Sequence, residues 1–290
     1  MSLRIKFNLA LFVTFLAGLA VAAALVWNIV QRHARTEVLQ EANIMMAQAN
    51  AVWEYTVNQI EPLLVDQQQV RFLPQSVPFF AAEANLRALS KQFPAYTFKN
   101  AAENPTNPAD QATPWEAAII AEFRQHPTLT QFVSVRQTKD GPVMSLSKPL
   151  RIDNKDCLAC HSTPAAAPPA MVDLYGPKNG FGWTLGSVQG AQIVSVPMRV
   201  ALARARSLFV TFMVALLGAF AVAFVLLNLL LHLVVIGRVK RMAVLAGEIS
   251  LGNNDAPEFE AAGRDEIASL GQSFNRMRRS LVSALKLLGS

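Results

Sequence analysis

The residues best suited to chemistry are the two cysteines of the chain and the histidine that follows them. Cys157, Cys160 and His161 form a Cys-x-x-Cys-His string, and the sequence holds no other cysteine. Two thiols at this spacing can form thioethers with the two vinyl groups of a haem, and the next imidazole can then bind the iron as its proximal ligand. The spacing therefore predicts one covalently attached haem c.

Three other uses of the cysteines fit the sequence less well. A structural disulfide gives no role to His161. A thioredoxin-like redox pair is expected within a strand-loop-helix pattern, which the surrounding residues lack. A zinc site needs further ligands, and the sequence has neither a second Cys-x-x-Cys pair nor a paired histidine.

The sixth ligand of the iron is not fixed by the sequence. A second thiolate is excluded because no third cysteine exists. The candidates are His126, Met171, Met144 and, less directly, Met198. A histidine at a helix end is commonly a solvated surface group, and methionine commonly fills a core. A vacant or water-bound position is an equal alternative.

Two apolar blocks divide the chain into four parts. Of the 290 residues, 52% are hydrophobic and 16% are charged, and the excess lies in residues 7–30 and 208–236. Each block exceeds the ~20 residues that a helix needs to cross a bilayer. The first is also longer than the ~7–15 apolar residues of a signal peptide, so we expect an uncleaved helix. The predicted parts are an N-terminal segment with the first span, a middle domain, a second span and a tail, at residues 1–30, 31–207, 208–236 and 237–290.

The haem prediction decides the topology, because the positive-inside rule does not. Five basic residues flank the outer ends of the spans, and five flank the enclosed loop. Haem is attached to such motifs after export in bacteria, so we expect the middle domain in the periplasm, both termini in the cytoplasm and membrane lipid around the spans. The net charge of +6 is dispersed, which predicts no nucleic-acid partner.

The middle domain mixes helical and strand patterns. Apolar spacings of three and four predict a helix over residues 36–64 that continues from the first span, and shorter helices over 81–92 and 114–124. Strands are predicted at residues 131–137, 143–152 and 187–196, the first two joined by an Asp140-Gly141 hairpin turn. This pattern predicts an α+β domain of PAS-like type.

The tail carries two heptad stripes separated by a break at residues 251–263. The stripes are Val239, Met242, Ala246 and Ile249, then Ile267, Leu270, Phe274, Met277, Leu281, Ala284 and Leu288. Two short helices with an extended connector directly after a span are typical of an all-α HAMP domain. Val239 stands where HAMP domains commonly have proline. HAMP helices pack as a parallel four-helix bundle, so we expect a homodimer.

The whole chain resembles a bacterial family of membrane-anchored sensors in which a periplasmic, single-haem c-type, PAS-like domain is fused to HAMP. The resemblance rests on the haem motif, the HAMP stripes, Trp115-Glu116, Gly180-Phe181-Gly182-Trp183 and residues 104–108 and 189–198. Some members provide a cysteine as second haem ligand, which this chain cannot do.

The resemblance implies a non-enzymatic sensor of redox state or of a small gaseous ligand such as oxygen, nitric oxide or carbon monoxide. Because no kinase, cyclase or methyl-accepting helix follows Leu288, we expect a separate cytoplasmic kinase or other output protein as partner. The alternative is a membrane-anchored cytochrome c that carries electrons, although such a protein needs no heptad relay. A peroxidase would need a distal acid-base group, for which His126 is the only obvious imidazole.

Overall fold

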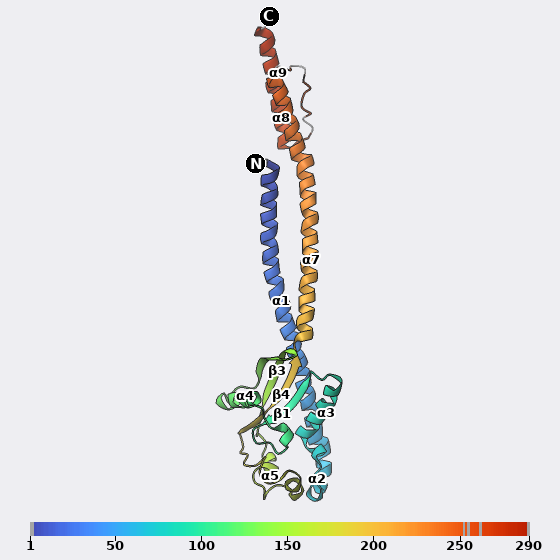
Figure 1. Ribbon diagram of the computed structural model, residues 1–290, viewed down its shortest axis with the longest axis vertical. Helices are drawn as coiled ribbons and strands as arrows, with labels where there is room; N and C mark the ends of the chain where they lie inside the picture. Colours follow the sequence, from blue (N-terminus) through green and yellow to red (C-terminus); the bar gives the residue numbers. More distant parts are fainter. Residues whose placement is uncertain (1–2, 252, 254–255, 261–262, 289–290) are drawn as a thin grey trace. The chain divides into compact units, whose positions relative to one another are not determined.

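The structure is a computed structural model that describes residues 3–251, 253, 256–260 and 263–288 (Figure 1). The chain divides into two compact units. One is Trp27–Leu208, and the other combines Met1–Val26 with Phe209–Ser290.

A four-stranded antiparallel sheet forms the centre of the first unit. Its strand order is β1-β4-β3-β2. The strands are β1 (Thr97–Ala102), β2 (Phe132–Thr138), β3 (Gly141–Arg151) and β4 (Val188–Pro197). The predicted hairpin is confirmed, since β2 pairs with β3 across the turn and Gly141 has a φ of 106°, which favours glycine.

Strand β1 was not predicted from the sequence. Lys99 and Asn100 lie in its middle and disrupt the apolar alternation. Both bond to distant groups: Lys99 Nζ lies 2.9 Å from the Glu116 carboxylate, and Asn100 Nδ2 donates to the Phe79 carbonyl at 3.2 Å. The strand forms because β4, far away in the sequence, pairs with it along its length.

Helices cover both faces of the sheet (Figure 1). One face packs on the long helix α1 (Leu3–Tyr55) and on α3 (Pro78–Gln92), and the other packs on α4 (Pro114–Gln125). Adjacent residues of β4 point to opposite faces of the pleated sheet: Val194 is buried on the face that packs on α1, and Ile193 on the face that packs on α4. The prediction of an α+β domain is confirmed.

Shorter elements complete this unit. Helix α1 continues through a π-helical turn, η1, into α2, which confirms the helix predicted over residues 36–64. The bounds are η1 (Thr56–Ile60), α2 (Glu61–Val70), the 3-10 turns η2 (Pro74–Ser76) and η3 (Pro108–Asp110), α5 (Cys157–His161) and α6 (Pro169–Tyr175).

The second unit contains two helices of membrane-spanning length and composition. Continuous helical stretches at Arg4–Gln68 and Arg199–Ser250 contain 18-residue windows of mean hydropathy 2.6 and 2.7, and neither window is buried. Phe15 stacks on Phe220 with ring centroids 5.0 Å apart. The elements are α7 (Arg199–Leu230), the π-helical turn η4 (Leu231–Ile236), α8 (Gly237–Ser250) and α9 (Glu266–Leu288).

Residues 256–260, between helices α8 and α9, pack against α9. The Asn275 side chain accepts from the Phe259 amide at 3.0 Å and donates to the Phe259 carbonyl at 2.8 Å, so one buried amide fixes the connector on α9. Arg238 pairs with Asp265 at 2.8 Å, and the same carboxylate accepts from the Ala268 amide in the first turn of α9.

Only part of the predicted heptad seam is covered within one chain. Met242 and Ile249 of α8 are buried, whereas Leu270, Met277 and Leu281 of α9 are 53%, 63% and 45% exposed. The residues of α9 that a single chain buries include Ala268 and Asn275, neither of which belongs to the predicted seam.

Candidate functional site

Helix α5 is a single turn that presents the Cys-x-x-Cys-His string. Cys157 and Cys160 are partly buried and are not joined in a disulfide. Burial raises the pKa of both thiols, and the carboxylate of Glu61 on α2 adds to the shift. A redox-active pair needs a lowered thiol pKa, so these cysteines do not have the environment of a thioredoxin-like site.

The ring of His161 is oriented by a backbone carbonyl. Its Nδ1 lies 2.7 Å from the Gly180 oxygen, which can only accept, so the proton is on Nδ1. Burial lowers the pKa of His161, against the opposing effect of this hydrogen bond, and the imidazole is therefore neutral at pH 7. No hydrogen bond to Nε2 occurs among the described residues, so its lone pair is free to bind a metal.

Trp183 holds the same ring from one side. The two rings stack with centroids 3.8 Å apart and planes 11° apart. Backbone bonds support the stack, from Trp183 N to His161 O at 3.2 Å and from Gly182 N to Ser162 O at 3.0 Å. Trp183 Nε1 is buried without a partner in the described part of the chain.

The loop before η3 fixes the carbonyl that orients His161. Asn104 accepts from Gly180 N at 3.1 Å and donates to Phe181 O at 3.3 Å, while Thr106 Oγ1 lies 3.4 Å from His161 Nδ1. Gly180 has a φ of 80°, and a Cβ there would lie 2.0 Å from Thr106 Oγ1. This position therefore requires glycine for two independent reasons.

The residues present fit the group that the sequence predicts. Two free thiols and one imidazole lie on a single helical turn, and the imidazole exposes Nε2 while Nδ1–H is fixed by a carbonyl. A metal-bound histidine commonly has this outer hydrogen bond, which sets its tautomer and its orientation.

The candidate sixth ligands lie in three different surroundings. His126 ends α4 on the surface, with Nδ1 3.1 Å from the Glu122 carboxylate. Met144 is buried in the core between α1 and the sheet, as is Met198. Met171 is buried on α6, whose Tyr175 ring meets Phe72 next to the end of α2.

None of the four is among the polar or ring contacts of His161 in the described residues, which are to Thr106, Gly180 and Trp183. Of the four, Met171 is on an element that packs against α2, the helix whose Glu61 affects both thiols. The assignment of a sixth ligand stays a prediction.

Sequence reasoning missed the roles of several residues around the site. Asn104, Thr106 and the Gly180–Trp183 segment entered only through a family resemblance, and Glu61 did not enter at all. Asn104 bonds to Gly180 and Phe181, which are 76 and 77 residues away along the chain, so no local spacing could have found these contacts.

Two carboxyl groups interact beside this loop: Asp110 of η3, which is half-buried, and Glu83 of α3, which is buried. Burial, and then the neighbouring Glu83 carboxylate, raises the pKa of Asp110 to about 7, although Lys99 and Arg87 oppose the shift. The pKa of Tyr175 on α6 is also raised, first by burial and then by the charge of Asp110. Asp110 is therefore mostly protonated at pH values below about 7.

The titration of Asp110 should make stability depend on pH. The pKa of Asp110 is about 7 in the folded state and about 3.9 in the unfolded state. Between these two pH values the folded state binds more protons than the unfolded state. The free energy of unfolding therefore falls as the pH rises to about 7. Thermal unfolding of the full chain in detergent should show a midpoint that falls from pH 5 to pH 8, by about 2–4 °C for each kcal/mol lost. Asp110→Asn removes this titrating group, and this part of the slope should disappear.

The matched control is Asp140→Asn, which changes an exposed carboxyl in the hairpin turn to a residue that suits the same turn. It should keep the pH slope of the parent protein. Equal slopes in the parent and in Asp110→Asn would contradict the raised pKa of Asp110.

Comparison with known proteins identifies two matching families. The profile of the Tll0287-like family matches residues 31–197, which is more than half of the chain, and the profile of the HAMP domain matches residues 230–283. The predicted HAMP domain is thereby confirmed. No curated protein matches the chain. A solved structure described as the cyanobacterial heme-protein Tll0287 is similar to this chain, with 16% sequence identity and a TM-score of 0.42. The match covers 56% of this chain and 95% of the chain in that structure.

Proposed function

The chain belongs to the Tll0287-like family, and we propose that it is a membrane sensor that carries one covalent haem c in the periplasm. In this proposal, residues 1–30 and 208–236 contain the two spans, residues 31–207 form the sensor domain, and residues 237–290 form the cytoplasmic HAMP domain. Both termini then lie in the cytoplasm. The two apolar helices and the HAMP match support a membrane protein of this kind.

The observation that carries the proposal is the state of His161. Its Nδ1–H is bound to Gly180 O, its ring is stacked on Trp183, and its Nε2 has no hydrogen bond among the described residues. Cys157 and Cys160 would hold the porphyrin through thioethers, and His161 Nε2 would bind the iron. A haem bound there supplies an iron centre that can change its oxidation state or its sixth ligand.

The residues that orient His161 could transmit a movement of its ring to other parts of the sensor domain. Gly180 lies between the His161 ring and the side chain of Asn104, so a shift of the ring alters bonds to both the 180–183 segment and the 104–108 loop. The 104–108 loop continues from β1, which pairs with β4, and β4 leads into α7. A connected path therefore runs from His161 to the start of the second span.

The HAMP domain would receive that change as a dimer. Leu270, Met277 and Leu281 share one side of α9 and are exposed within a single chain. Because a heptad seam is stabilised by the matching seam of another helix, a second copy of the chain is the natural partner. The output would pass to a separate cytoplasmic protein, such as a kinase.

Cross-linking of the HAMP helices tests the proposed relay. We expect Leu270→Cys in the full chain, in membranes, to form dimers with a bismaleimide. The yield should differ between haem poised oxidised and haem poised reduced at an electrode, because the two states favour different helix packings. Electrophoresis on denaturing gels measures the yield.

The matched control is Gln272→Cys, an exposed α9 position about 200° further round the helix, which should cross-link less in both states. The parent protein should not cross-link, because its own cysteines are used in thioethers. Equal yields from Leu270→Cys in the two redox states would favour the electron carrier instead, and no dimer at all would contradict the bundle.

A further inference from the structure

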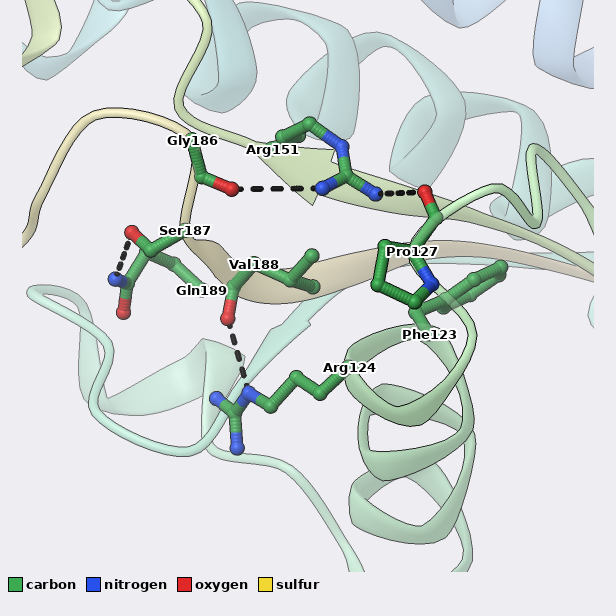
Figure 2. A pocket seen from close by; sticks show the side chains of 8 residues that line it. All are labelled: Phe123, Arg124, Pro127, Arg151, Gly186, Ser187, Val188 and Gln189. Atoms are coloured by element: carbon green, nitrogen blue, oxygen red, sulfur yellow. Dashed lines mark hydrogen bonds between the residues drawn. The ribbon is translucent and has the colours of Figure 1, made fainter.

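A cavity of about 410 Å³ lies where β3 ends and β4 begins, beside the last turn of α4 (Figure 2). Its volume is within the range of small-molecule sites. Two arginines from different elements line it together with apolar and amide side chains. The lining residues are Phe123, Arg124, Pro127, Arg151, Gly186, Ser187, Val188 and Gln189.

A β-bulge directs Arg151 to this cavity. The register of β3 against β4 shifts between Leu150 and Arg151, and such bulges commonly re-aim a side chain beside a site. The guanidinium of Arg151 donates to Pro127 O at 2.9 Å and to Gly186 O at 3.4 Å. Both partners are neutral, so among the described residues no carboxylate pairs with this charge.

Arg124 also retains donors that the fold does not use. Its Nε donates to Val188 O at 3.0 Å, and one terminal nitrogen pairs with the exposed carboxylate of Glu103. The other terminal nitrogen has no partner within the described residues. An exposed ion pair of this kind contributes little to stability, so Glu103 can be displaced by a competing anion.

The remaining lining selects the kind of anion. Phe123 and Val188 are buried, so the apolar surface of this lining comes mainly from the exposed Pro127, which suits a carbon skeleton more than an inorganic ion. Planar guanidinium groups match the geometry of carboxylates.

We propose that this cavity binds a carboxylate group between Arg151 and Arg124. Two sources have this chemistry. One is a free small organic acid. The other is a propionate of the haem, an assignment that rests on the proposed function, because the cavity adjoins Gly186, three residues after Trp183, and Arg151, six residues before Cys157.

Binding of succinate to the purified full chain distinguishes the sources. If the ligand is a free acid, calorimetry should detect succinate binding, and Arg151→Gln should weaken it about tenfold or more, since a hydrogen bond to a charged group contributes about 1.5–3 kcal/mol. Arg151→Lys should be intermediate, because it keeps the charge and loses the fork. Gln189→Glu keeps both arginines but adds a competing carboxylate, and it should also abolish binding.

If the ligand is a haem propionate, succinate should not bind the parent protein. The propionate bending band in resonance Raman spectra should then shift in both Arg151→Gln and Arg151→Lys. The control is Lys139→Gln, an exposed charge at the hairpin turn, which should leave succinate binding and the propionate band unchanged.

The proposal is overturned if succinate does not bind the parent protein and the propionate band is the same in all variants. It is also overturned if Lys139→Gln weakens succinate binding as much as Arg151→Gln. If the purified protein shows no haem absorbance, the proposed function is contradicted. Succinate binding is then the one measurement that tests whether the cavity binds a carboxylate.

Discussion

Haem should no longer run with the polypeptide in denaturing electrophoresis once Cys157 and Cys160 are both replaced by alanine. Thioether bonds survive denaturation, whereas a haem retained only through His161 is released when the fold is lost. We expect complete loss of the haem-staining band in the double variant, in cells that express the bacterial haem-attachment machinery. Each single variant keeps one thiol and should show a weaker band.

The control for this experiment is Ser162→Ala, in the same segment. Gly182 N donates to the backbone carbonyl of Ser162, so the loss of the Ser162 hydroxyl should leave haem content unchanged. Extraction of all haem from the parent protein by acidified acetone would show that the haem is not covalent. A full-strength band in Cys160→Ala would exclude that cysteine as an attachment point.

The second large effect is expected from one methyl group at Gly180. Alanine there would place Cβ 2.0 Å from Thr106 Oγ1 and 2.9 Å from the Thr106 backbone, so either Gly180 or the 104–108 loop must move. That movement breaks the 2.7 Å bond that orients His161. We expect Gly180→Ala to lose most of its haem and to change the absorption spectrum of the haem that remains.

Gly182 provides a matched control two residues away. It has the same φ of 80°, so alanine carries the same backbone strain, about 1–2 kcal/mol, but its Cβ would meet nothing within 4 Å. Gly182→Ala should therefore keep the haem content and spectrum of the parent protein. Adding Thr106→Ala to Gly180→Ala removes the nearest clashing atom and should recover part of the haem. Equal losses in the two glycine variants would mean that backbone strain, and not the contact with Thr106, is responsible.

The features that the sequence determined are those encoded by neighbouring residues. The Cys-x-x-Cys-His string, the Asp140-Gly141 turn and the heptad stripes of the tail each depend on spacings of a few residues. The helices and the β2–β3 hairpin formed as expected, and the HAMP domain was identified correctly. The family resemblance drawn from the same motifs was also correct.

The tertiary structure decided what depends on distant partners. Strand β1 exists because β4 pairs with it and because Glu116 and Phe79 bond to its Lys99 and Asn100 side chains. Likewise, the sequence names His161 but does not show which nitrogen is free. The Gly180 carbonyl binds Nδ1 and so leaves Nε2 free. Gly180 is itself positioned by Asn104, which accepts from Gly180 N and lies 76 residues earlier in the chain. Local propensity records only near neighbours along the chain, whereas hydrogen bonding in a folded domain joins residues at any separation, so the surroundings of the site could only be found in three dimensions.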